Sequence, residues 1–227
     1  MLVVMKRTPS GYLPLICGLG GLLTINLCYL IAAVNGHVEW CIPYWDSCTS
    51  ISAIGRKMPE AIVFKGLMLP VAVLVMVYWA TAYHRLCHWR NNHRRGCACM
   101  RILGMAAALF LIIYTFSLGS QGDLFRHLRY IAVNLAFTLT WLAQLLFTWL
   151  LIESVRRHDL ELASWLTRSL MGLCMLILVV GISYVVSSAF YAGHRDVEDA
   201  FEWNLALLLN VHFILAFFIW SRASGTA

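Results

Sequence analysis

The segment from Leu13 to Val34, LPLICGLGGLLTINLCYLIAAV, decides the fold class of this chain. It contains no charged residue, and its length is close to the 20 or so apolar residues that a helix needs to cross a bilayer. Lys6 and Arg7 precede it, and no convincing small-residue cleavage site follows it. We therefore expect a retained first transmembrane span rather than a cleaved signal peptide.

Five further stretches resemble this first one in length and polarity. They cover residues 61–83, 102–118, 131–152, 170–190 and 203–220. Of the 227 residues, 61% are hydrophobic and only 12% are charged, against roughly a quarter in soluble domains. A spanning segment must pair its own backbone polar groups, and no alternating strand pattern is present. The sequence predicts an all-α, integral membrane, six-helix bundle that forms a single domain over residues 1–227.

Basic residues are unevenly divided between the two sets of span ends. One set carries eleven Lys and Arg residues with three acids, whereas the other carries six with eight acids. The positive-inside rule places the first set, and with it both termini, in the cytoplasm. Segments 41–60, 119–130 and 191–202 then face outward or into a lumen. We expect the plasma (inner) membrane in a bacterium, and an endomembrane or the plasma membrane in a eukaryote.

The first outer connection, CIPYWDSCTSISAIGRKMPE from Cys41 to Glu60, is a long polar loop between two apolar spans. Cys41 and Cys48 are separated by six residues, and an oxidising compartment would permit a disulfide between them. Two free thiols are the alternative. This loop is the largest segment in which specific recognition could occur.

The inner connection between the second and third spans is rich in possible metal ligands. Histidine and cysteine are the ligands that zinc prefers, and they occur here at His84, Cys87, His88, His93, Cys97 and Cys99. Their spacing matches no standard zinc site, and the neighbouring arginines would repel a cation. We predict no metal and no cofactor, and a basic surface that faces anionic lipid headgroups.

Acidic and histidine side chains in the outer connections suggest one catalytic alternative. His127 could act with Glu60, Asp123 or Glu202, because a histidine beside a carboxylate suits general acid–base chemistry. No nucleophile elbow, zinc-protease motif or paired aspartate motif accompanies them. Our main prediction is therefore that the chain has no catalytic residues, with an enzyme of lipid acyl or headgroup remodelling as the alternative.

Two short motifs suggest a family. Ile51, Ser52, Gly55, Pro59, Glu60 and Phe64 keep the spacing of the first-loop signature of the DRAM/Sfk/FRAG membrane family, and Ala200-Phe-Glu202-Trp203 resembles its Glu-Trp pair at the last span. Ala53 stands where the autophagy branch has an aspartate, and Met58 where it has a first proline. The family is related to the Cwh N-terminal domain and to GPI-anchor lipid-remodelling proteins. The resemblance implies six spans with a long first outer loop.

The same residues have a physical interpretation as an outer lid. Gly55 allows a turn that other residues resist, Pro59 and Glu60 suit the first turn of the second span, and Ser50 or Ser52 can bond loop backbone donors. The interpretation predicts a lid or ligand motif that consists of Ser50, Ser52, Gly55, Pro59, Glu60, Phe64, Glu202 and Trp203, with Trp203 in the interfacial aromatic belt. Both a structural role and ligand recognition fit these residues.

The function that we expect from these features is that of a non-enzymatic, lipid-linked regulator. Its partners would be membrane lipids, with a membrane protein as a further possible partner, and no nucleic acid. Glycines within the spans, which would let helices approach closely, are Gly18, Gly21, Gly66, Gly104, Gly172 and Gly181.

Overall fold

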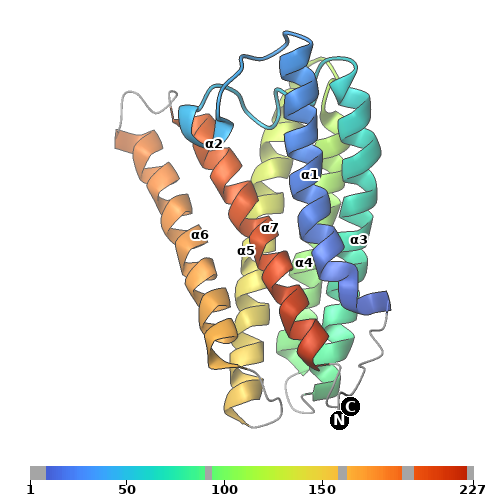
Figure 1. Ribbon diagram of the computed structural model, residues 1–227, viewed down its shortest axis with the longest axis vertical. Helices are drawn as coiled ribbons and strands as arrows, with labels where there is room; N and C mark the ends of the chain where they lie inside the picture. The colour runs from blue at the N-terminus through green and yellow to red at the C-terminus, as the bar shows by residue number, and fades with distance from the viewer. Residues whose placement is uncertain (1–8, 90–93, 158–162, 191–196, 224–227) are drawn as a thin grey trace, which may run out of the picture.

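A computed structural model describes residues 9–89, 94–157, 163–190 and 197–223 (Figure 1). The described part of the chain contains six long helices and no strand: α1 (Leu13–Val34), α3 (Glu60–Trp89), α4 (Arg94–Ser117), α5 (Asp123–Arg156), α6 (Ser164–Phe190) and α7 (Glu198–Ala223). A 3₁₀ turn, η1 (Pro9–Tyr12), precedes α1, and the short helix α2 (Pro43–Asp46) lies in the first outer loop. All six long helices are long and apolar enough to cross a membrane, which confirms the predicted fold class.

The helices extend beyond the apolar spans that the sequence indicated. The first span agrees with α1 at both ends, but α5 begins at Asp123 rather than near residue 131, and α7 begins at Glu198 rather than near 203. Asp123, His127 and Glu202 therefore lie on helices, whereas the sequence predicted that they lie in loops. Hydropathy marks only the part of a helix within hydrocarbon, whereas backbone hydrogen bonding continues into the polar ends.

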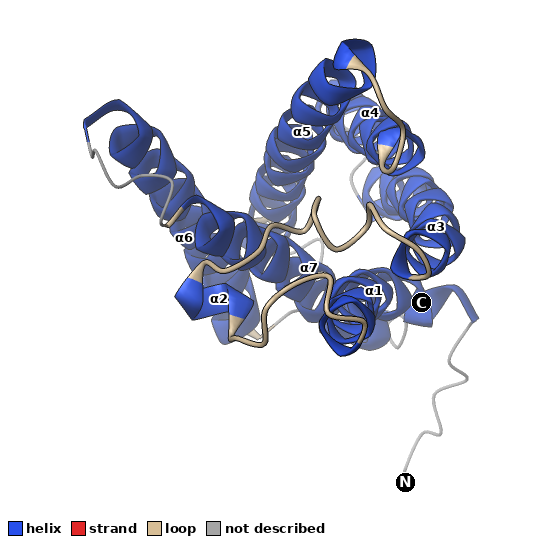
Figure 2. Ribbon diagram, turned by 90° about the horizontal axis from the view of Figure 1, so that it is seen from above, coloured by secondary structure: helices blue, strands red, loops and turns tan. Residues whose placement is uncertain are grey.

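Five helices, α1, α3, α4, α5 and α7, surround a common interior, and α6 stands outside this group (Figure 2). The first outer loop crosses above the interior at one end of the bundle. In Figure 1, α6 lies near α5 at the lower end and diverges from it toward the upper end, where the loop lies. The start of α1 and the end of α7 lie at the opposite end, as six crossings require.

The buried side chains form two clusters along the bundle axis. The cluster far from the loop is aromatic: Tyr78, Trp79, Phe147, Phe213 and Trp220 are all less than 5% exposed. The cluster beneath the loop contains Ile51 and Ile54 from the loop itself, together with Phe64, Tyr114 and Trp203. The loop is therefore part of the core at its end of the bundle.

Close helix approach occurs at three of the span glycines. A Cβ at Gly104 would overlap the indole ring of Trp79, and one at Gly21 would overlap the side chain of Asn210. At Gly18 a Cβ would lie 2.6 Å from the backbone oxygen of Asn210 and 2.8 Å from Cγ1 of Ile214. The expectation was wrong for Gly66, Gly172 and Gly181, since no atom of another helix among the described residues lies within 4 Å of a Cβ added at these positions.

We expect Gly18→Ala to push α1 away from α7 and to lower the free energy of unfolding by about 1–3 kcal/mol. The obstacle is partly the backbone of α7, which cannot rotate away as a side chain can. SDS titration of the purified protein in mixed micelles measures the change. Gly172→Ala in α6 is the matched control, since its new methyl group meets open space; equal stability of both variants and the unmutated protein would contradict the prediction.

Candidate functional site

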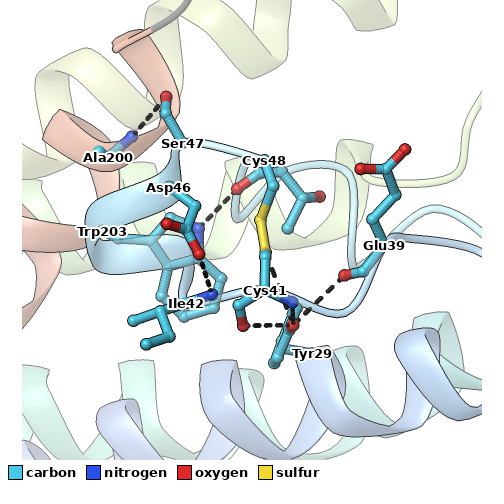
Figure 3. Close-up of a disulfide and its surroundings, with 10 residues drawn as sticks. Tyr29, Glu39, Cys41, Ile42, Asp46, Ser47, Cys48, Ala200 and Trp203 are labelled. Carbon is cyan, nitrogen blue, oxygen red and sulfur yellow. Dashed lines mark hydrogen bonds between the residues drawn. A yellow bond between two sulfur atoms is a disulfide. The ribbon is translucent and has the colours of Figure 1, made fainter.

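The first half of the outer loop forms a small cap, whose short helix α2 packs against α7 (Figure 3). A disulfide joins Cys41 to Cys48, whose Cα atoms are 6.6 Å apart, and closes the turn that contains α2. The hydroxyl of Tyr29 on α1 donates to the carbonyl oxygen of Cys41 and accepts from its N–H, both at 2.8 Å. The cap is therefore closed within itself and bonded to the bundle.

The two motifs singled out in the sequence meet each other in the structure. The indole Nε1 of Trp203 donates to the carbonyl oxygen of Thr49 at 2.7 Å, and the backbone N–H of Ile51 donates to Oε2 of Glu202 at 3.1 Å. One turn earlier, the N–H of Ala200 donates to Oγ of Ser47 at 3.1 Å (Figure 3). The first turns of α7 thus fasten the loop at its middle.

Trp203 is fully buried, so the expectation that it lies in the interfacial belt was wrong. Its ring meets Tyr29 and Tyr44 edge to face, with centroids 6.0 and 5.1 Å apart. Because Thr49 satisfies the indole N–H inside the protein, the side chain needs no contact with water. Burial raises the pKa of the Tyr44 hydroxyl, and the hydrogen bond that it accepts from Nδ2 of Asn26 opposes this shift.

The second half of the loop is the lid, which we define as Ser50–Glu60. Oγ of Ser50 accepts from the N–H of Ala53 at 3.1 Å, and Oγ of Ser52 accepts from Nη2 of Arg56 at 2.6 Å. Gly55 is buried, and a Cβ there would lie 3.1 Å from Leu118 and 3.3 Å from Phe64. Gly55 lies in a turn, as expected, but its φ is not positive, so what requires glycine here is the close packing rather than the backbone conformation.

Glu60 is fully buried at the first residue of α3. Its Oε1 lies 2.6 Å from Nδ1 of His37, a residue of the connection between α1 and α2. No local spacing in the sequence connects a histidine with a carboxylate 23 residues later, so His37 carries no signal of this contact. This pair ties the end of α1 to the start of α3.

Beneath the lid lies a cavity of about 90 Å³ with an almost wholly apolar lining. Ile51 of the lid and Phe64 near the start of α3 contribute to it, and residues of both core clusters complete it. Tyr114 and Glu202 are its polar members at the lid end. Phe64, a residue of the predicted motif, is fully buried here and lies edge to face with Tyr114 at 6.5 Å.

A larger groove, about 560 Å³ in volume, adjoins this cavity between the lid, α5, α6 and α7. Tyr114, Val133, Phe137 and Glu202 line both spaces, so the two spaces are adjacent at these residues. Ser50, Ser52 and Arg56 of the lid form one wall of the groove. Its charged lining residues are Arg56, Arg126, Arg129, Glu198, Asp199 and Glu202.

The residues of the catalytic alternative are not brought together. Nδ1 of His127 bonds the backbone carbonyl of Asp123 at 2.8 Å, and the carboxylate of Asp123 pairs with Arg126 on the surface. Glu60 is bound by His37 and Glu202 by Ile51. His127 is exposed and is not among the residues that line the groove. This geometry does not favour acid–base catalysis by His127.

The connection between the second and third spans is mostly helical, because α3 continues to Trp89 and α4 begins at Arg94. His93 lies outside the described residues, Cys97 is buried and Cys99 is exposed. Within the described ranges, no group of three His, Cys, Asp or Glu side chains is placed to hold a metal ion.

The family model described as the Frag1/DRAM/Sfk1/Cwh43P N-terminal domain matches residues 9–220. The chain belongs to this family. The match covers both motifs that carried the resemblance, the lid and the Glu202–Trp203 pair, and the structure shows that these motifs bond each other. Comparison with curated proteins and with solved structures finds no match.

Proposed function

We propose that this protein is a non-enzymatic, lipid-linked regulator that binds a membrane lipid beneath its lid. The observation that carries the proposal is that an apolar cavity lies directly beside a charged groove, with Tyr114, Val133, Phe137 and Glu202 lining both. A lipid has the same division, because its acyl chain is apolar and its headgroup is polar. The groove volume also lies within the usual range of small-molecule sites, about 300–1,000 Å³.

Tyr114 supplies a second argument for an occupant. Its side chain is buried, it lines both spaces, and its hydroxyl has no hydrogen-bond partner among the described residues. An unpaired buried hydroxyl is unfavourable by roughly 1–3 kcal/mol. A headgroup or ester oxygen at the junction of cavity and groove would accept this hydrogen bond.

The position of the groove suggests how a lipid would enter. Its wall includes Gly181, Tyr184 and Val185 from the outer part of α6, where that helix diverges from α5. Val185 is 62% exposed, and Asn134 and Thr138 of α5 are also exposed. A lipid would therefore enter sideways from the surrounding leaflet. The lid would report its presence, because Ser50 and Arg56 line the same groove.

We expect Val133→Trp to block this site, because the larger ring would fill the junction of cavity and groove. The probe is phosphatidylethanolamine with a diazirine in one acyl chain, photolysed with the protein in nanodiscs. Cross-links to α5 and α7 peptides around Phe137 and Leu209 should fall about tenfold, the change that 1.4 kcal/mol of binding produces.

Ile131→Trp is the matched control for this experiment. It introduces the same ring two residues earlier on α5, at a side chain that is 52% exposed and outside both linings. Labelling of the cavity peptides should remain unchanged in this variant. Equal labelling in Val133→Trp and Ile131→Trp, or no labelling of these peptides in the unmutated protein, would contradict the proposed function.

A further inference from the structure

The charges of the groove are divided between its walls. The basic residues come from the lid and from α5, namely Arg56, Arg126 and Arg129, and the acidic residues all come from α7, namely Glu198, Asp199 and Glu202. Both signs of charge therefore line the groove, on different structural elements, and of the three arginines Arg126 is already paired with Asp123. A surface built to hold only an anion or only a cation would not combine them in this way.

We infer that this groove recognises the headgroup of a zwitterionic phospholipid, with its phosphate toward the arginines and its ammonium group toward the carboxylates. The inference rests on the proposed function and adds the chemical class of the ligand. An anionic headgroup without an amine would leave the three α7 carboxylates facing an anion. A cationic headgroup without a phosphate would leave the arginines facing a cation.

The arginines keep donors for a phosphate despite their bonds within the protein. Arg129 uses Nη1 to donate to the carbonyl oxygens of Ser117 and Ser120, both at 2.9 Å, and Arg56 uses Nη2 for Ser52. Each guanidinium has five N–H donors in a planar fork. These bonds hold the side chains in place while other N–H groups remain, which suits charge-assisted bonds to phosphate oxygens.

The carboxylates are held in a similar way. Glu202 accepts the N–H of Ile51 at Oε2, and Oε1 of Glu198 accepts from the hydroxyl of Tyr184 at 3.3 Å. An ionised carboxylate has two oxygens and about four acceptor positions, so an ammonium group can be bound in addition. All three acids lie in the first two turns of α7, at the end of the bundle where the lid lies.

The depth of the lining also fits a phospholipid. Besides the charged residues, the groove is lined by the apolar side chains of Val133, Phe137, Val185 and Leu205, of which Val133 and Phe137 also line the cavity. The buried hydroxyl of Tyr114, which has no partner among the described residues, lies where these parts join. An ester oxygen of the glycerol region that reached this hydroxyl would accept its hydrogen bond.

A competition experiment tests the inference. The full-length protein in nanodiscs is photolabelled with the diazirine phosphatidylethanolamine, and unlabelled lipids with the same acyl chains compete. The competitors are phosphatidylethanolamine, anionic phosphatidylglycerol, and a cationic lipid that has an ammonium group and no phosphate. We expect phosphatidylethanolamine to compete about tenfold better than either other lipid, as one charge-assisted hydrogen bond would produce.

The variant Glu198→Gln/Asp199→Asn keeps the shape of the α7 wall and removes two of its charges. We expect it to lose the preference, so that phosphatidylglycerol competes as well as phosphatidylethanolamine. Glu39→Gln is the matched control, because this outer-loop acid is exposed and its carboxylate points away from the cap (Figure 3). It should keep the tenfold preference.

The outcomes separate this inference from the proposed function. If the cavity peptides are labelled but all three lipids compete equally, a lipid binds and the zwitterion inference is overturned. The zwitterion inference is also overturned if phosphatidylglycerol competes best, or if the double variant keeps the preference of the unmutated protein. If Val133→Trp does not reduce labelling, the proposed function and this inference both fail.

Discussion

Trp203→Ala is expected to release the outer loop from α7 and to lower the free energy of unfolding by about 3–5 kcal/mol. The side chain is fully buried beneath the cap, and it is among the largest fully buried side chains in the described residues. Alanine would leave a cavity between Tyr29 and Tyr44, whose rings meet the indole edge to face. It would also leave the Thr49 carbonyl without its indole donor.

Trp203→Phe separates packing from hydrogen bonding. It keeps an aromatic ring but removes the N–H, so its effect should be about 1–3 kcal/mol, the usual penalty for an unpaired buried acceptor. SDS titration in mixed micelles measures the loss in the free energy of unfolding for Trp203→Ala and for Trp203→Phe. Limited proteolysis of the loop between Cys48 and Glu60 should be faster in Trp203→Phe than in the unmutated protein, and fastest in Trp203→Ala.

Trp220→Ala is a useful comparison for Trp203→Ala. Trp220 is equally buried, but it belongs to the aromatic cluster at the other end of the bundle and stacks on Tyr78. Trp220→Ala should lower the free energy of unfolding about as much as Trp203→Ala does, without exposing the outer loop to protease in the folded state. If Trp203→Ala leaves both stability and loop proteolysis unchanged, the α7 contact does not hold the loop.

Much of the fold could be predicted because membrane spans depend on local composition. Leu13–Val34 was placed correctly at both ends, since polar residues flank an uninterrupted apolar run. The other spans were found but were too short, because helices α5 and α7 continue through charged residues that hydropathy excludes. The divergence of α6 could not be predicted, since its composition is as apolar as that of helices inside the bundle.

The candidate site was predictable only as two separate motifs. The sequence indicated that the lid and the Glu202–Trp203 pair belong to a site. The structure shows two hydrogen bonds between the loop and this pair, and their partners are separated by 151 and 154 positions in the sequence. Arg129 and Tyr184 of the groove were not selected, because single basic or aromatic residues on an apolar helix carry no local signal of a site. Their roles depend on which helices are neighbours.

His37 is the clearest case of a residue that only the tertiary structure identifies. We expect His37→Ala to lower the free energy of unfolding by about 3 kcal/mol, near the upper end of the penalty for leaving a buried hydrogen-bonding group without its partner. Glu60 has no exposed side-chain surface, whereas His37 retains 26%. Oε2 of Glu60 has no partner among the described residues, so the contact at Oε1 is its main stabilising hydrogen bond.

A double variant tests whether the buried carboxylate is the cause of this loss. His37→Ala/Glu60→Met removes both polar groups, and replacing a whole buried pair by apolar residues is often nearly neutral. We therefore expect the double variant to recover most of the stability that His37→Ala loses, in the same SDS titration.

His127→Ala is the matched control for the histidine substitution, because His127 is exposed and its ring bonds only one turn of its own helix. It should change stability by less than about 0.5 kcal/mol, as surface substitutions usually do. Two results would contradict this prediction: an equal loss of stability in His37→Ala and His127→Ala, or a double variant that is as unstable as His37→Ala. Either would show that the contact between His37 and Glu60 does not hold the start of α3 against α1. The physical reason for expecting otherwise is the burial of Glu60: a carboxylate removed from water needs a donor, and His37 is the side chain that supplies one.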